Sequence, residues 1–149
     1  MTYLQLCQRL RAECQDIGSG PSSVQSSATR DAIYINAIKD AWIEIQLLRK
    51  DWTFWPEDNS HSLTSPQLLA ADNDEPFIPA QYHLGLVYYA MAQRALTLAA
   101  TEMIEKSNVG WGRYYSMLLD RYTGDVVIGE PPSTYCDDSC YSVGEILAQ

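Results

Sequence analysis

The stretch TRDAIYINAIKDAWIEIQLLRKDWTFW, residues 29–55, decides the fold because a long helical pattern ends here in a burst of aromatic residues. The pattern predicts an amphipathic helix over about residues 29–50. Its apolar stripe comprises Ile33, Ala37 or Ile38, Ala41 with Trp42, Ile45 and Leu48. Thr29 is placed to cap the start of this helix, and Asp31 suits the positive end of its dipole.

The aromatic run DWTFW follows at the point where the chain leaves this helix. Large rings at such a point are expected to pin the helix end into the core, because each ring buries a large apolar area. The tryptophans are therefore predicted to anchor the core or a subunit contact. They are Trp42, Trp52, Trp55 and Trp111.

A shorter helix is expected before this one, over about residues 2–15. Thr2 and Gln5 match a capping box at its start. One face carries a helical stripe, and three charged side chains lie off that stripe. The stripe comprises Tyr3, Leu6, Cys7, Leu10 and Cys14, and the charged residues are Arg9, Arg11 and Glu13.

Two more helical patterns follow in the second half of the chain. The first begins at Pro79, a favoured first-turn residue, and continues to about Lys106. Gly110 and Gly112 in NVGWG are expected to break the pattern before a last helix over about residues 111–123. The chain is thus predicted to be all-α, a bundle of about four helices.

Two polar segments connect these helices, and a third follows the last one. Residues 18–28 form a Gly/Ser/Pro connector, and residues 56–78 are expected to project from the body as a loop or small hairpin. Residues 124–149 are too polar for a core element and are expected to form an extended C-terminal arm. The predicted organisation is a helical domain over residues 1–123 followed by this arm.

The net charge of −9 is concentrated in two of these segments. Residues 51–78 hold six acids and residues 124–149 hold five, and neither range contains Lys or Arg. Because binding to a phosphate backbone needs clustered Lys and Arg, the sequence argues against a nucleic-acid-binding protein. The acids serve either solubility alone, or contact with a basic partner, or a passage that must repel DNA.

The sequence shows no pattern typical of catalysis, metal binding or cofactor binding. His61 and His83 lack companions at metal-ligand spacing, and GSGPSS lacks the Lys of a phosphate-binding loop. Glu102 and Glu105 suit a solvated helix face better than a glycosidase pair. No run approaches the roughly 18 apolar residues of a membrane span, and no signal peptide opens the chain. A soluble, non-enzymatic protein made in the cytoplasm is therefore expected.

The four cysteines are expected to be free thiols. Cys7 and Cys14 share a helix face but lie about 10 Å apart along the axis, too far for a disulfide. Cys136 and Cys140 (CDDSC) are close enough in sequence to approach each other in a turn, and whether they pair is left open. They lack a second pair at zinc-site spacing.

Four stretches, taken in order, resemble the tailed-phage head-to-tail adaptor proteins, also called connector or head-completion proteins. They are TYLQLCQRLRAECQDIGSGPSSVQ (residues 2–25), DAWIEIQLLRKDWTFW (40–55), FIPAQYHLGLVYYAM (77–91) and RYYSMLLDRY (113–122). The resemblance covers about residues 2–123. Its most specific parts are the GSGP junction and the pattern AW.EIQ…R.DW.F.

The resemblance implies a helical bundle that assembles as a ring of identical subunits, commonly a dodecamer, under the portal protein. Such a ring extends the DNA channel without reading sequence and offers a platform for the next tail or neck protein. The implied location is the neck of the virion after assembly in the host cytoplasm, with no membrane partner. Related proteins often carry a longer, strand-rich insertion where residues 56–78 stand here.

Under this interpretation two sets of residues become candidate contacts. Portal or neighbour contacts are assigned to Gly18, Gly20, Pro21, Tyr135, Tyr141, Val143, Ile146 and Leu147. Channel-facing acids are assigned to Asp58, Asp72, Asp74 and Glu75.

Two other classes of function remain open. One is a small acidic helical regulatory or binding module that contacts a basic protein, which predicts a monomer or dimer with one partner. The other is an enzyme such as a virion-borne cell-wall hydrolase, which predicts loss of activity when Glu102 or Glu105 is changed.

Overall fold

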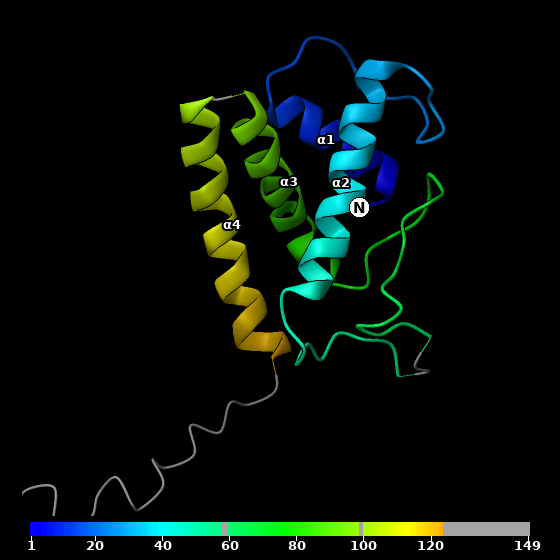
Figure 1. Cartoon of the computed structure of the whole chain (residues 1–149), viewed down its shortest axis with the longest axis vertical. Coiled ribbons are helices and arrows are strands. Elements are labelled where there is room, and N and C mark those ends of the chain that lie inside the picture. The colour runs from blue at the N-terminus through cyan, green and yellow to red at the C-terminus, as the bar shows by residue number, and fades with distance from the viewer. Residues whose placement is uncertain (58–59, 99, 124–149) are drawn as a thin grey trace, which may run out of the picture.

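The computed structural model describes residues 1–57, 60–98 and 100–123 (Figure 1). Within these residues four α-helices pack together, with no strand and with a long loop between the second and third helices, which confirms the all-α prediction. The helices are α1 (Tyr3–Glu13), α2 (Thr29–Leu47), α3 (His83–Leu98), which follows the short 3₁₀ helix η1 (Ala80–Tyr82), and α4 (Thr101–Tyr122). The predicted C-terminal arm lies outside the described residues.

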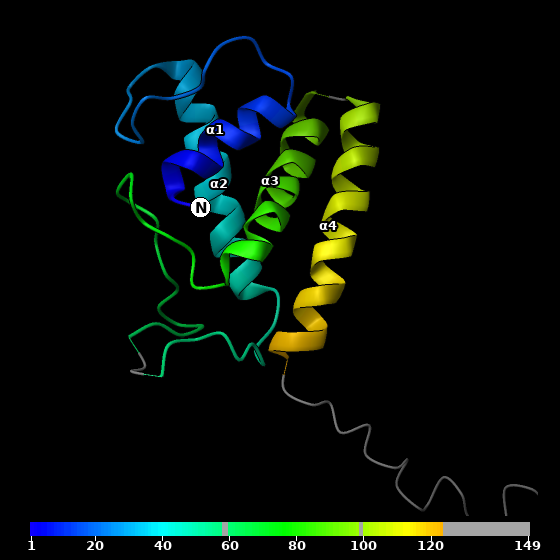
Figure 2. The ribbon, with the colours of Figure 1, turned by 180° about the vertical axis from the view of Figure 1, so that it is seen from behind.

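Helix α3 is the centre of the fold. It packs against each of the other three helices, whereas α4 packs chiefly against α3. Figures 1 and 2 show α2 and α4 on opposite sides of α3, with α1 lying across α2 and α3. The arrangement leaves α2 and α4 as the two edges of a helical layer.

Helix α1 follows its predicted pattern at the start and along its apolar face. The Thr2 side chain accepts a bond from the Gln5 backbone, and the Gln5 side chain accepts one from Thr2, so the capping box is confirmed. The stripe is buried except for Cys14, which is half-buried. The expectation that Arg11 lies off the buried face is wrong, because only 7% of this residue is exposed.

Helix α2 differs from its prediction at both ends. Its N-cap is Ala28, which makes no side-chain bond, so the assignment of Thr29 as the cap is wrong by one residue. Leu48 belongs to the predicted apolar stripe but is 44% exposed, and it directly follows Leu47, the last residue of the helix. The core below that end is filled instead by Trp52 and Phe54, and the Trp52 indole donates to the Ile45 carbonyl at 3.0 Å.

The predicted break at NVGWG is wrong. Helix α4 runs through Gly110 and Gly112, and the chain turns between α3 and α4 near Ala100. A Cβ on Gly110 would lie 2.5 Å from the Tyr88 ring, so this glycine allows α3 and α4 to approach closely. Gly85 on α3 does the same for Tyr114 on α4, where a Cβ would lie 2.6 Å from the tyrosine Cβ. These two glycines therefore serve helix packing.

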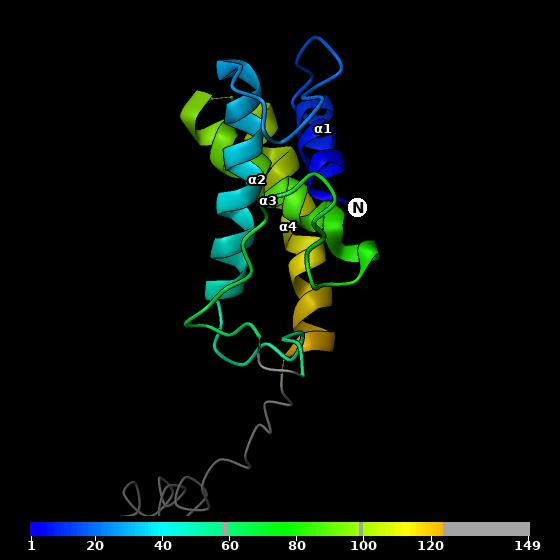
Figure 3. The ribbon, with the colours of Figure 1, turned by 90° about the vertical axis from the view of Figure 1, so that its right-hand side faces the viewer.

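The long loop between α2 and α3 was predicted to project from the body, but part of it packs into the core. Leu69 and Ile78 lie in the core, and Ser62 and Ser65 form a single isolated bridge. The later part of the loop returns to α1, where the Tyr3 backbone nitrogen donates to the Asp74 carbonyl at 2.7 Å. Figure 3 shows this return from the lower end of α2 toward the N-terminus. The loop thus forms one wall of the body.

Among the described residues, no helix is both long enough and apolar enough to cross a membrane.

Candidate assembly surface

The four tryptophans divide into two pairs. Trp42 and Trp52 are buried in the core, while Trp55 and Trp111 are half-buried and pack against it. Phe54 joins three of them, with ring centroids 6.0 Å from Trp42, 5.1 Å from Trp52 and 5.4 Å from Trp55. Trp111 packs on α3 and α4 side chains instead. Only Trp55 and Trp111 therefore leave ring surface within reach of another molecule.

The Gly18–Ala28 connector is exposed at its start and held down in its middle. Gly18 and Gly20 adopt positive φ angles of 107° and 86°, which glycine tolerates at little cost. Pro21 is buried, and its carbonyl accepts a bond from the Gln8 side chain at 2.9 Å. Of the three predicted contact residues here, Gly18 is the most open to a partner.

A network around the buried Arg11 fixes where this connector begins. The Arg11 guanidinium donates to the Ile17 carbonyl and to Asp31 at the start of α2. Asp16 accepts from Arg30 and, at 2.6 Å, from the Tyr34 hydroxyl. The bond from Arg30 holds the pKa of the Asp16 carboxyl well below its usual range, while burial and Asp16 raise the pKa of Tyr34 to about 12.

The predicted channel-facing acids occupy different environments. Asp72 accepts bonds from the Val24 backbone at 2.6 Å and the Ser23 hydroxyl at 3.1 Å. Asp74 accepts bonds from the backbone nitrogens of Ala70 and Ala71. Both carboxylates are thus engaged inside the chain. Glu75 is exposed and forms an ion pair with the N-terminal ammonium at 3.7 Å, and Asp58 lies outside the described residues.

The Asp72 bonds join the connector to the long loop, so we expect Asp72→Ala to lower the free energy of unfolding by about 1–3 kcal/mol. The loss arises because the buried Val24 would keep its position while its backbone nitrogen loses a charged acceptor. Urea denaturation followed by circular dichroism measures it. Glu75→Ala is the matched control and should change stability by less than about 0.5 kcal/mol. Equal effects of the two changes would contradict the structural role of Asp72.

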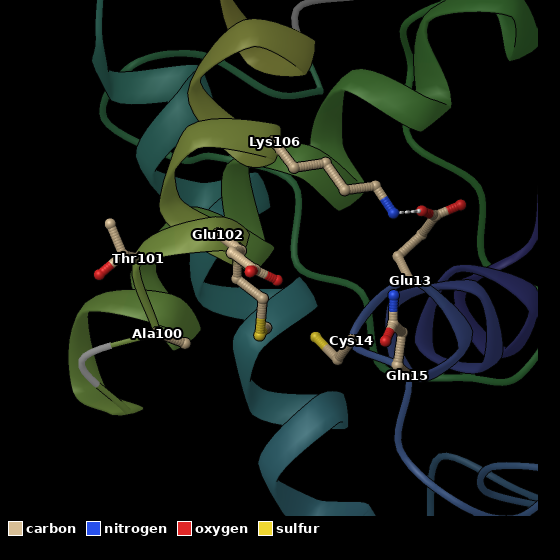
Figure 4. A pocket seen from close by; sticks show the side chains of 8 residues that line it. Glu13, Cys14, Gln15, Ala100, Thr101, Glu102 and Lys106 are labelled. Carbon is tan, nitrogen blue, oxygen red and sulfur yellow. Dashed lines mark hydrogen bonds and ion pairs between the residues drawn. The ribbon is translucent and has the colours of Figure 1, made fainter.

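A pocket of about 580 Å³ opens between the end of α1 and the start of α4. Figure 4 shows the Cys14 side chain pointing across it toward α4 and Lys106 reaching from α4 to Glu13. The Glu13 carboxylate binds Lys106 at 2.7 Å and Arg9 at 2.6 Å. Burial would raise the pKa of Glu13, but these two cations lower it below its usual value.

The chemistry of this pocket does not favour catalysis. Burial raises the pKa of the Cys14 thiol to about 11, so the sulfur stays protonated at neutral pH and is a poor nucleophile. Glu13 has both cations bound and is not free to act as a base. Glu102 and Glu105 are exposed on α4. In the described part of the chain, no group of three His, Cys, Asp or Glu side chains is arranged to hold a metal ion.

His83 is a core residue of the fold. It is buried, and its Nε2 lies 2.7 Å from the Ile78 carbonyl oxygen, so that nitrogen carries the proton. Burial lowers the pKa of the imidazole, which is therefore neutral at pH 7. The ring holds the end of the long loop against α3.

Four of the six large apolar side chains that are exposed in the described residues lie on or at the end of the two edge helices, and the other two, Ile17 and Leu68, lie in connecting segments. On α4, Val109 is 76% exposed and Met117 is 40% exposed. On the opposite edge, at the end of α2, Leu47 is 47% exposed and Leu48 is 44% exposed. We call these the α4 edge (Val109 and Met117) and the α2 edge (Leu47 and Leu48). The amphipathic pattern that predicted the helices did not predict these edges, which depend on which helix lies at the centre.

The remaining predicted contacts, Tyr135, Tyr141, Val143, Ile146 and Leu147, lie outside the described residues. Comparison of the chain with known protein families, with curated proteins and with solved structures finds no match.

Proposed function

We propose that this chain is a structural head-to-tail adaptor of a tailed phage. It forms a ring that docks on the portal, extends the DNA channel and carries the attachment platform for tail components. The four-helix body supports the proposal, because it covers the same residues as the sequence resemblance. The resemblance itself rests on the GSGP junction and on the segment that forms α2 and its aromatic end.

The observation that carries the proposal is the pair of apolar edges on opposite sides of α3. A heterologous contact joins two different surfaces, one from each of two neighbouring subunits. Repetition of that contact closes a ring when the rotation between neighbours allows it. The α4 edge of one copy would pack against the α2 edge of the next. A contact of this kind uses both edges in every subunit and leaves no apolar edge exposed in a closed ring.

Charge supports a conduit for DNA. The chain carries a net charge of −9, and the exposed carboxylates of the long loop, such as Glu57 and Glu75, have no Lys or Arg within their segment. A negative lining repels the phosphate backbone and lets DNA slide. Asp72 and Asp74 add to the negative electrostatic potential of that loop, although their carboxylates are hydrogen-bonded within the chain.

Native mass spectrometry of the full chain mixed with a candidate portal ring tests the proposal. We expect a mass increment of many copies per portal ring, which would also give the stoichiometry. The chain alone is a weaker test, because a template can be required for closure. Absence of binding at micromolar concentrations would contradict the adaptor role and favour the regulatory module with a basic partner.

Two charge substitutions test the edge-to-edge contact. We expect Met117→Glu on the α4 edge and Leu47→Glu on the α2 edge each to prevent ring formation, since a charge buried in each contact costs several kcal/mol. An equimolar mixture of the two variants should form dimers but no rings, because each variant keeps one intact edge. Native mass spectrometry on the portal template reads out both results.

The control is Gln81→Glu, an exposed position on η1 that belongs to neither edge. It should assemble normally, and all three variants should keep the helical circular dichroism of the parent. Rings of Met117→Glu subunits would show that the α4 edge is not the contact. Dimers from either variant alone would indicate a symmetric interface instead.

A further inference from the structure

A second concave surface lies between α3 and α4. This groove has a volume of about 570 Å³. Its lining residues are Leu84, Tyr88, Glu105, Lys106, Val109, Gly110, Arg113 and Tyr114. The rings of Tyr88 and Tyr114 stack with centroids 6.1 Å apart, and the close helix approach at Gly110 brings them together. The floor is therefore aromatic and apolar, with the exposed Val109 beside it.

The groove also has a polar rim. Lys106 and Arg113 supply positive charge and Glu105 supplies negative charge. Lys106 is already bound to Glu13, whereas Arg113 is exposed and makes no ion pair with any residue in the described part of the chain. An occupant that suits this groove presents apolar side chains to the floor and carboxylates to Arg113.

We propose that residues 135–147 of the same chain occupy this groove. Their sequence, YCDDSCYSVGEIL, combines two tyrosines and three aliphatic residues with three acids, and it contains no Lys or Arg. Tyrosine packs well on stacked aromatic rings. The carboxylates of Asp137, Asp138 and Glu145 complement Arg113. The free chain thus covers its own apolar groove with its C-terminal segment.

The length of the chain permits this arrangement. Helix α4 ends at Tyr122, and Val109 lies about 20 Å back along its axis. Residues 124–134 reach roughly 36 Å when extended, which is enough to bring Tyr135 to the groove. A tether of suitable reach gives an effective concentration in the millimolar range, so binding within one chain outcompetes binding between chains at micromolar concentration.

Cysteine crosslinking on the full chain tests the proposal, because the segment carries Cys136 and Cys140. A Val109→Cys variant places a thiol beside the groove, and diamide oxidises neighbouring thiols to a disulfide. The control is Lys39→Cys, which places a thiol on the exposed side of α2 at the opposite edge of the layer. Non-reducing electrophoresis and peptide mass mapping identify the product.

We expect the Val109→Cys variant to form an intrachain disulfide with Cys136 or Cys140 about tenfold faster than the control, given the effective concentration of a docked segment. Adding Arg113→Glu should slow this reaction by roughly threefold, the size of one exposed ion pair. Arg121→Glu, also exposed on α4 but outside the groove, should leave the rate unchanged.

Equal rates at the two introduced thiols would overturn the proposal, as would equal effects of the two arginine changes. A product made mainly of crosslinked dimers would show that the segment binds another chain, which also overturns the intrachain arrangement. The assay uses the chain alone, so its result is independent of ring assembly on a portal.

Discussion

The Trp42→Ala variant is expected to lose about 3–5 kcal/mol of the free energy of unfolding, the largest loss that a single substitution in this chain should cause. Trp42 is fully buried in the C-terminal half of α2 and packs on Phe54 with ring centroids 6.0 Å apart. Its indole nitrogen also donates to the Gln67 side chain at 3.0 Å, so the ring joins α2 to the long loop. Removing it leaves a cavity and an unpaired amide oxygen.

Urea denaturation monitored by circular dichroism measures the loss. Because a change of this size approaches the total stability of many domains, Trp42→Phe serves as a milder variant that keeps a ring but not the nitrogen. It should lose about 1–3 kcal/mol from the smaller ring and the missing bond. Trp55→Ala, where the ring is half-buried, is the matched control and should lose less than Trp42→Ala. A larger loss at Trp55 would contradict the core described above.

The same substitution at two glycines of α4 is expected to act with opposite sign. Gly110→Ala should lower the free energy of unfolding by about 1–3 kcal/mol, because the new methyl group would overlap the Tyr88 ring. Gly112→Ala should raise it by about 0.5–1 kcal/mol, because alanine favours a helix and no atom lies within 4 Å of the new Cβ. Thermal or urea denaturation of both variants checks the pair.

A double-mutant cycle identifies the cause of the Gly110 effect. In a Tyr88→Ala background the overlap is gone, so Gly110→Ala should become neutral or stabilising. If Gly110→Ala stabilised the parent protein, α3 and α4 would be farther apart than in this structure. Destabilisation by both glycine changes would instead restore the sequence-based expectation of a helix break at NVGWG.

The two glycines also show why the helix boundary could not be predicted from sequence. A glycine ends a helix when the backbone needs a positive φ angle, and it continues a helix when a neighbouring element needs the space of a side chain. The choice at Gly110 depends on Tyr88, which belongs to a different helix. The sequence NVGWG alone therefore does not distinguish a glycine that ends a helix from one that continues it.

The predicted channel-facing acids also could not be assigned from sequence alone. Asp72 and Asp74 were assigned to a channel because they lie in an acidic segment, yet their carboxylates bind backbone nitrogens. The donors to the Asp72 carboxylate are Ser23 and Val24 of the connector, which lies far away in sequence. Gln46 is a further case, since it lies buried in the apolar face of α2 and bonds to the backbone of Gln67 at 2.8 Å and 3.1 Å.

The sequence by itself determined the features that depend on neighbours within a few residues. These are the all-α class, the capping box of α1, the apolar stripe that places Leu6 and Leu10 in the core, and the aromatic end of α2. Each follows from helical periodicity or from a bond across three residues, and such interactions are fixed once the local backbone forms.

The tertiary structure alone decided which polar groups are buried and which apolar groups are exposed. Arg11 is buried because Ile17 and Asp31 offer acceptors that only the returning chain brings near. The α4 edge is exposed because α3, at the centre of the layer, covers only one side of α4. The burial of a side chain and the identity of its hydrogen-bond partners depend on how segments distant in sequence pack together. A local sequence pattern does not contain that information.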